Sequence, residues 1–244
     1  MKARLSSSIL LFALATPAFA NQNFYVGAFG GGGSPNHINA GQFGTVYIVE
    51  ASGGPLAVNA FGKLNNKSAA FFGAQLGYQA QHISINSSSQ WTLGPAVELE
   101  GLSMNKSTFS ATLYNYTDRA DEHEFVVSYP MYRNVFLANA VFSFNSPRFT
   151  VQPYIGFGIG SALVRISGAN SVQVNPAEAG INHYNTDPSD TNTTFAGQLK
   201  LGLGYNLNKH VSFFAEYRRL YIASSHFELG STAYATHAPT SSWK

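Results

Sequence analysis

The chain has no cysteine among its 244 residues, so disulfides and thiolate metal sites are excluded. Charge is scarce: Asp, Glu, Lys and Arg make up 11% of the sequence, against roughly 25% in an ordinary soluble domain. The mean hydropathy of -0.05 excludes a bundle of membrane-spanning helices. The chain is instead rich in glycine, with 23 residues, and in aromatic residues, at 14%, which is typical of a β-rich protein with unusual surfaces.

Residues 1–20 have the pattern of an export leader. Lys2 and Arg4 form a basic start, and residues 9–15 form an apolar stretch that is too short to span a bilayer. Ala18-Phe19-Ala20 is a small-x-small cleavage site. We therefore predict a signal peptide that is removed after export.

Loss of this leader removes two of the 14 basic residues and none of the 12 acidic ones, which leaves 12 of each sign. A chain with a formal charge of zero lacks the excess of basic residues that is typical of nucleic-acid-binding proteins. We expect no nucleic-acid partner.

Residues 195–221 show the clearest alternation in the chain. From Phe195 to Tyr205 the odd positions carry mostly Phe, Leu and Tyr, while the even positions carry Ala, Gln, Lys and Gly. A period of two predicts a strand, because successive side chains point to opposite faces. Residues 206–210 predict a turn, and residues 211–221 alternate again. An apolar face opposite a face of small and sparsely charged residues suits a membrane-spanning β-barrel, with lipid outside and a narrow lumen inside.

The same pattern recurs along the chain and predicts seven strands, at residues 24–32, 69–79, 91–104, 133–144, 148–165, 195–205 and 211–221. The long connections between them are predicted at residues 33–67, 105–132 and 167–192. Long connections alternate with short ones, as in barrels with one end outside the cell and the other in the periplasm. The predicted fold over residues 21–244 is all-β: an antiparallel up-and-down transmembrane β-barrel of the eight-strand type, with its final strand weak or missing.

Six outward aromatic residues fall at the short-turn ends of the predicted strands. They are Phe24, Tyr78, Trp91, Phe144, Phe149 and Tyr205. Aromatic side chains gather where a membrane meets water. We therefore predict that all six lie on one rim of the barrel.

Several stretches resemble a known family. They are the leader, the Phe24-Tyr25-Val26-Gly27 opening, residues 93–100, and residues 197–217 with their Glu216-Tyr217-Arg218 ending. They are similar to the small eight-stranded outer-membrane barrels, namely the OmpA-type transmembrane domains and the opacity-type surface proteins. The resemblance covers most of the chain after the leader. It implies a surface-exposed protein of the bacterial outer membrane, with outer-membrane lipid, lipopolysaccharide, the barrel assembly machinery and host surface molecules as partners.

The end of the chain departs from that family. Family members end in a strand with a terminal aromatic residue, whereas residues 222–244 are polar and end in Trp243-Lys244. Seven strands would leave an unpaired edge in lipid, which is very costly. Either a poorly patterned segment at residues 227–235 closes the barrel, or the chain is truncated before its last strand. We favour truncation.

Five charged residues fall on the predicted inward faces: Glu98, Glu100, Lys200, Glu216 and Arg218. Because a buried charge must be paired, we predict a Glu/Lys/Arg network in the lumen. Such a network either fills the lumen structurally or gates it. We favour structural filling.

No pattern indicates a catalytic, cofactor-binding or metal site. The seven histidines lack the spacing of metal ligands. Two glycine-rich stretches, residues 27–35 and 156–160, lack the Lys-Ser/Thr and the following helix of a phosphate-binding loop. Acid–base groups that could meet at the outer rim are Asp118, Asp121, His123, His183 and Asp187. Because their spacing does not require a site, we expect no enzyme and no cofactor.

Three functions compete. The first is a non-enzymatic outer-membrane surface protein with a structural and adhesion or interaction role through its extracellular loops. The second is a narrow, porin-like channel for ions or small solutes, which bilayer conductance would distinguish. The third is a soluble β-barrel that binds a lipid in the periplasm, which heat-modifiable migration and outer-membrane fractionation would exclude.

Overall fold

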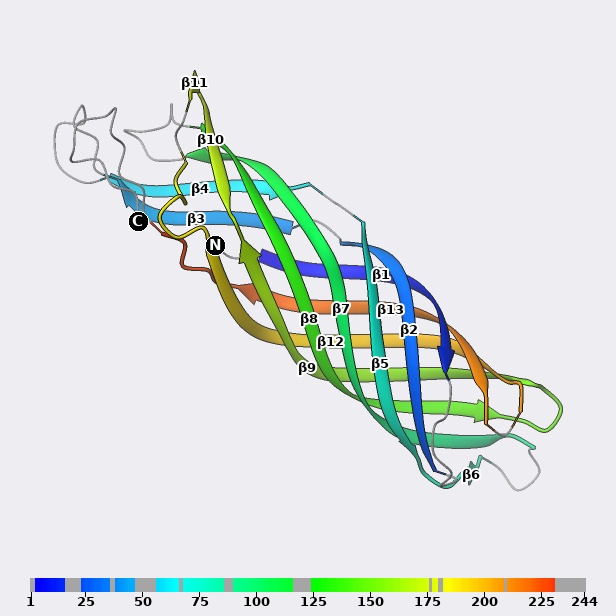
Figure 1. Ribbon diagram of the computed structural model, residues 1–244. Coiled ribbons are helices and arrows are strands. Elements are labelled where there is room, and N and C mark those ends of the chain that lie inside the picture. The colour runs from blue at the N-terminus through cyan, green and yellow to red at the C-terminus, as the bar shows by residue number, and fades with distance from the viewer. Residues whose placement is uncertain are drawn as a thin grey trace.

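The computed structural model describes residues 3–15, 23–35, 38–46, 56–65, 68–85, 90–115, 124–175, 177–179, 182–208 and 210–230 (Figure 1). This part of the chain consists of β-strands, turns and bends. It contains no helix with the length and hydropathy needed to cross a membrane.

Eight strands pair in a closed antiparallel ring. In ring order they are β1 (Ala3–Ala15), β2 (Phe24–Pro35), β5 (Ala69–Gln79), β7 (Thr92–Asn115), β8 (Glu124–Asn145), β9 (Val151–Ser167), β12 (Ser189–Asn206) and β13 (Ser212–Ser225). Five shorter strands lie off the ring: β3 (Ile38–Val46), β4 (Leu56–Leu64), β6 (Ile83–Ser84), β10 (Asn170–Asn175) and β11 (Ala177–Glu178). The predicted antiparallel β-barrel class is therefore confirmed.

The register of the ring is that of a strongly tilted barrel. Following directly paired residues once around it from Phe24 leads back to β2 at Ser34, so the offset is 34 − 24 = 10 residues. With eight strands, this offset tilts the strands by roughly 40° to the barrel axis. An even offset also keeps every inward position inward around the ring, because the side-chain period along a strand is two.

All seven predicted strands are present in this ring. The eighth place belongs to β1, which lies within the predicted leader and pairs with β13 on one side and with β2 on the other. Residues 226–230, the described beginning of the alternative closing segment, form no strand, and residues 231–235 lie outside the described part. Removal of the leader stays a prediction.

Large apolar side chains face outward in the half of the barrel that carries the short connections, which we call the membrane half. Leu99 on β7 is 65% exposed and Ile159 on β9 is 66% exposed, whereas Glu98 and Glu100 are buried. This polarity is inverted relative to a soluble protein. It places the apolar side chains in hydrocarbon and the charged ones in the lumen.

Polarity returns to the ordinary sense towards the far end of β7, where Leu102 and Met104 are already buried in the apolar core just before a β-bulge. From Met104 to Ser107, β7 advances three residues while β8 advances two, from Arg133 to Met131, so β7 carries one extra residue. The inward positions of β7 therefore change from even to odd numbers. Beyond the bulge, Phe109 is fully buried.

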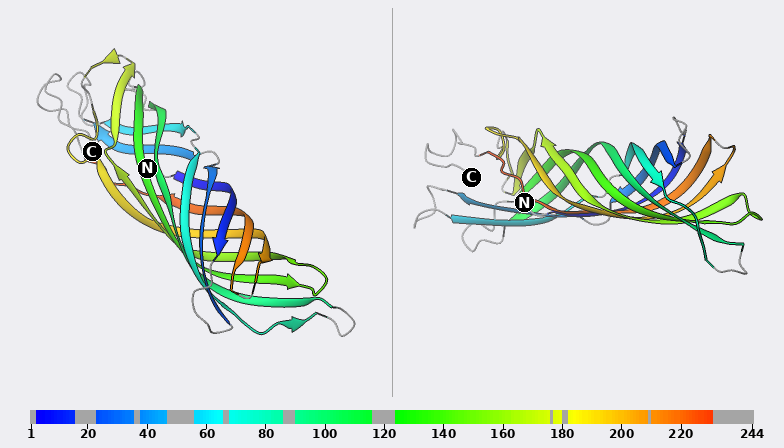
Figure 2. Two further views of the ribbon diagram at one scale, coloured as in Figure 1. Left: turned by 45° about the vertical axis from the view of Figure 1, so that its right-hand side comes forward. Right: turned by 90° about the horizontal axis from the view of Figure 1, so that it is seen from below.

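The long strands β7 and β8, of 24 and 22 residues, continue past the bulge into what we call the extracellular half. There the hairpin β3–β4 joins the end of β7, and β10 joins β8. These additions all lie at the end of the barrel opposite β6 (Figures 1 and 2). Ile38 of β3 is fully buried in the same apolar core as Phe109.

The long connections are therefore shorter than predicted. β3 and β4 lie within the first, β7 and β8 extend into the second, and β10, β11 and the start of β12 occupy the third. The alternation in these segments is mixed: Ile38 and Ala40 of β3 are buried, whereas in β10 the polar Ser171 and Gln173 are buried and Val172 and Val174 are exposed. A search for a lipid-facing pattern does not detect such strands.

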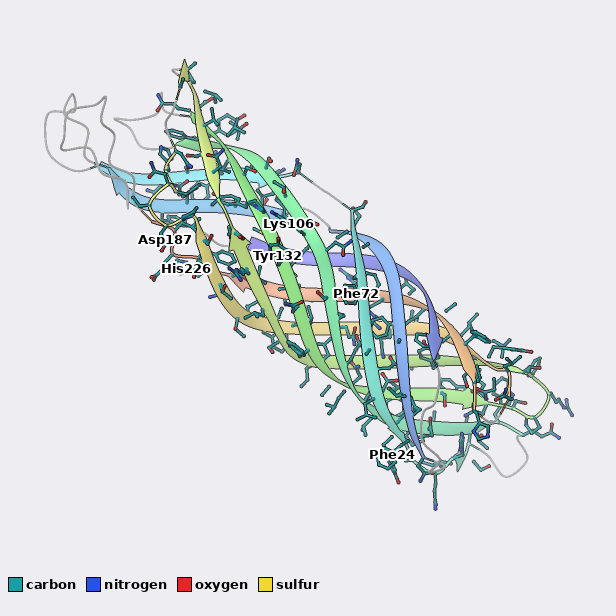
Figure 3. The ribbon with its side chains drawn as sticks, viewed as in Figure 1. Phe24, Phe72, Lys106, Tyr132, Asp187 and His226 are labelled. Carbon is teal, nitrogen blue, oxygen red and sulfur yellow. The ribbon has the colours of Figure 1, made fainter. Side chains whose placement is uncertain are left out.

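The aromatic residues at the short-turn end form contacting pairs. Phe24 and Tyr78 pack edge to face with ring centroids 4.9 Å apart, and Trp91 stacks on Phe149 at 5.7 Å. Figure 3 shows Phe24 at the end of the barrel that carries β6. Phe24 and Tyr78 are direct cross-strand partners on β2 and β5, and aromatic rings of this kind gather at the membrane boundary.

Candidate functional site

A layer of charged side chains crosses the lumen of the membrane half. β7 supplies Glu98 and Glu100, β12 supplies Lys200, and β13 supplies Glu216 and Arg218. Residues two apart on one strand point to the same face, so each pair on β7 and β13 enters the lumen together. All five side chains are buried, and Arg218 is fully enclosed.

The two cations of this layer bridge the three carboxylates. Lys200 Nζ pairs closely with Glu98 and lies 3.3 Å from Glu100 Oε2 and 3.9 Å from Glu216 Oε2. Arg218 pairs closely with Glu100, and its Nη2 lies 2.8 Å from Glu216 Oε1. The five predicted lumen residues thus form one connected cluster.

Two tyrosines donate further hydrogen bonds to the carboxylates from the side of the short turns. The sequence analysis did not predict either tyrosine as a site residue. The Tyr25 hydroxyl donates to Glu98 Oε1 at 2.7 Å, and the Tyr154 hydroxyl donates to Glu216 Oε2 at 2.9 Å. Each ring lies over a glycine of the next strand. A Cβ atom on Gly77 would lie 2.1 Å from the Tyr25 ring.

Two side-chain amides donate hydrogen bonds to Glu100. Asn139 Nδ2 and Gln198 Nε2 each donate to Glu100 Oε2 at 3.2 Å, and Gln198 also donates to Asn139 Oδ1 at 2.6 Å. These residues lie on inward positions of predicted strands. The sequence indicates that these two amides are polar and point inward. It cannot indicate which side chain each of them contacts across the ring.

The layer closes the lumen. A buried ion pair is more stable when further hydrogen bonds support its charged groups, and here tyrosines and amides supply such bonds to the carboxylates. Of the buried lumen charges, Arg133 lies apart from this layer, in contact with Ser107 Oγ at 3.5 Å and over the Phe109 ring at 5.2 Å. Among the described residues Arg133 makes no ion pair.

A cavity lies at each end of the barrel. The one at the short-turn end, which we call the vestibule, has a volume of about 400 Å³ and reaches Glu98 and Glu216. The other, at the extracellular end, has a volume of about 210 Å³ and is lined by Tyr129, His183 and Tyr184, among others.

Hydrogen bonds order the extracellular cavity. The Tyr129 and Tyr184 hydroxyls lie 2.7 Å apart, and Tyr184 donates to Gln42 Oε1 at 2.9 Å. Tyr129 therefore donates to Tyr184. Burial raises the pKa of the Tyr129 hydroxyl, so this donor keeps its proton.

Two of the five acid–base groups predicted at the outer rim lie in the described part of the chain. His183 is buried against the Phe125 ring, with centroids 3.8 Å apart, while Asp187 is exposed at the extracellular end (Figure 3). Asp118, Asp121 and His123 lie outside the described residues. The described part of the chain contains no group of three or more His, Asp or Glu side chains that could hold a metal ion.

The closed antiparallel ring, the outward apolar band and the charged lumen define a membrane β-barrel. Residues 6–238 match the family described as the outer membrane protein beta-barrel domain. The chain belongs to this family. Its location in the outer membrane follows from that membership.

No curated protein sequence matches the chain. Among solved structures, the chain is similar to the outer membrane protease OmpT from Escherichia coli, with 8% sequence identity. The match covers 92% of this chain and 97% of the protease, at a TM-score of 0.32.

The expectation that the protein is not an enzyme is corrected by this comparison. One solved outer-membrane barrel to which the chain is similar is a protease, so a non-enzymatic role does not stand as a conclusion. A TM-score of 0.32 gives no argument for assigning protease activity to this chain.

Proposed function

We propose that the protein is a closed outer-membrane barrel whose extracellular half makes contacts with surface partners. The observation that carries this proposal is the division of the interior. A buried charge layer fills the membrane half, and a separate apolar core holds the extracellular half together. Such a molecule presents a stable surface outside the membrane and has little free lumen for solute.

An exposed aromatic patch on the extracellular half favours an interaction role. Phe43 and Phe61 pack edge to face with centroids 5.5 Å apart and are 52% and 44% exposed. Tyr114, the cross-strand partner of Phe61, is 48% exposed. Aromatic residues that remain exposed outside the membrane mark contact surfaces, because they gain most when a partner excludes water.

The patch gives a direct test of adhesion. We expect the double substitution Phe43→Ser and Phe61→Ser to reduce attachment of protein-displaying cells to host cell surfaces at least tenfold. Val172→Ser, which removes a 49% exposed side chain outside the patch, serves as the matched control. Unchanged attachment by the double variant, with normal heat-modifiable migration, would refute the role of the patch.

Lipopolysaccharide is the lipid partner that the outer rim favours. Lys106 Nζ lies 5.6 Å from the centroid of the Tyr132 ring, and Tyr132 is the cross-strand partner of Arg165 (Figure 3). Both Lys106 and Arg165 face outward near the bulge, where the apolar band ends. Two cations beside an aromatic ring suit the phosphate groups of that lipid.

A narrow channel is the alternative, and the cavities at the two ends of the barrel are the observation in its favour. Conduction would require Lys200 and Arg218 to leave their carboxylates. Planar-bilayer recording decides between the two functions. We expect no steady unitary openings; large, steady openings would favour the channel.

A further inference from the structure

The vestibule is a built cavity that the proposed surface role does not use. It lies at the opposite end of the barrel from the aromatic patch, and its inner end is the charge layer. Its lining combines apolar side chains such as Phe213 and Phe214 with polar ones, among them the amides of Gln75, Gln79 and Gln152 and the hydroxyls of Tyr25 and Tyr154.

The charge facing this cavity is negative. Of the five members of the charge layer, only Glu98 and Glu216 line the vestibule, while Lys200 and Arg218 do not. The layer contains three carboxylates and two cations, so it carries one excess negative charge. The nearby hydrogen-bond donors do not cancel that charge, because Tyr25 and Tyr154 are neutral hydroxyls.

Gln75, which lines the same cavity, carries a buried acceptor atom without a partner among the described residues. Gln75 is 8% exposed, and its Oε1 atom has no hydrogen-bond partner in the described part of the chain. A buried polar atom of this kind is rare in folded proteins and calls for a donor. The inward position of Gln75 on β5, as cross-strand partner of Glu100, holds it next to the charge layer.

Glu98 also retains acceptor capacity. Its Oε1 accepts from Tyr25, and its Oε2 accepts from Lys200. A carboxylate can accept about four hydrogen bonds, so two positions remain. Glu98 and Gln75 therefore offer acceptors, and no cation of the layer lines the same cavity.

We infer that the vestibule binds a small organic cation with several N–H donors, namely a protonated primary amine, entering from the short-turn end. The ammonium group donates to Gln75 and to Glu98, and the excess negative charge of the layer offsets its own. An anion is repelled by the two carboxylates. A neutral alcohol satisfies the acceptors but gains nothing from the charge.

The test uses the full-length folded protein in detergent, with putrescine as the probe and 1,4-butanediol as its neutral counterpart of equal length. Binding is measured by isothermal titration calorimetry at constant ionic strength. We expect saturable binding of putrescine and none of butanediol. Equal responses to both probes, or a putrescine response that sodium chloride reproduces, would overturn the inference in favour of a cavity that holds only water.

Substitutions at Gln75 give effects of opposite sign. Gln75→Leu removes the free acceptor and should weaken putrescine binding about tenfold. Gln75→Glu adds a carboxylate and should tighten it. Gln42→Leu, at the extracellular cavity, is the matched control and should leave the affinity unchanged. If neither Gln75 variant changes the affinity while both migrate as folded barrels, the site is not in the vestibule.

Discussion

The two halves of this barrel use the same strands with opposite polarity. In the membrane half of β7, Glu98 and Glu100 point inward while Val97 and Leu99 face outward. In the extracellular half of the same strand, Phe109 and Leu113 are buried inside. The difference teaches that the surrounding medium, rather than the strand, decides which side chains belong in the interior.

A bulge at Met104–Ser107 accompanies this inversion on β7. One extra residue on β7 shifts the inward positions from even to odd numbers without breaking the pairing with β8. β8 changes its interior from Asn139 to Tyr129 without an extra residue, so the inversion comes from the residue types and not from the bulge. Four predictions break or sharpen this comparison, from the largest expected effect to the smallest.

Loss of β1 should have the largest effect, and it acts on the membrane half. Without this strand, the N–H and C=O groups of β13 and β2 face lipid unpaired, at a cost of several kcal/mol for each group. Cleavage of the predicted leader would remove β1, so this comparison tests that prediction against the closed ring. We expect the chain lacking residues 1–20 to refold less completely in detergent than the full chain, as judged by heat-modifiable migration. Equal recovery would mean that another segment takes the place of β1.

The second-largest effect comes from substituting two buried arginines, one within the charge layer and one apart from it. Arg218→Met leaves Glu100 and Glu216 without their guanidinium partner, so we expect a loss of roughly 3–5 kcal/mol of unfolding free energy. Arg133→Met removes a buried cation without an ion pair among the described residues, so we expect a neutral or stabilising effect. Urea unfolding in detergent measures both. Similar losses from the two substitutions would contradict the role assigned to the ion pairs.

A charge placed on the outer face should be costly in one half alone. Leu99→Arg puts a cation into hydrocarbon and should cost about 2–4 kcal/mol. Ser110→Arg, on the outward side of β7 beyond the bulge, is its matched counterpart and should change stability by less than about 0.5 kcal/mol. Refolding into lipid vesicles under urea measures the two values. Equal costs would place the membrane boundary elsewhere.

Crowding in the narrow lumen gives the smallest effect. A Cβ atom on Gly202 would lie 2.2 Å from the Tyr154 ring, so Gly202→Ala should displace that ring and cost about 1–3 kcal/mol. Gly101→Ala is the control, because its Cβ would lie 3.7 Å from the Phe136 ring, an ordinary contact. Thermal unfolding measures the stability of both variants. Unchanged stability of Gly202→Ala would show that the Tyr154 ring can move aside without cost.

The sequence predicted the membrane half well because its pattern is local. Alternation over residues 195–205 is enough to place Gln198 and Lys200 inside and Leu201 outside. It predicted the extracellular half poorly, since β3, β4 and β10 were expected to be connections. These strands are short, and their outward faces mix polar residues such as Asn39 with apolar ones such as Phe43 and Val172, so they lack the continuous pattern of a lipid-facing strand. The change of parity at the bulge ended the pattern of β7 at Met104.

By itself, the sequence determined the barrel class, the seven strands after the leader and the inward position of all five charged lumen residues, because a period of two is a property of neighbouring residues. The tertiary structure alone decided which of those charges meet, how Tyr25, Tyr154 and Gln75 border the vestibule, and how β3, β4 and β10 extend the barrel. These contacts join residues far apart in the chain, such as Arg218 and Glu100, and the ten-residue offset of the closed ring brings them to the same level.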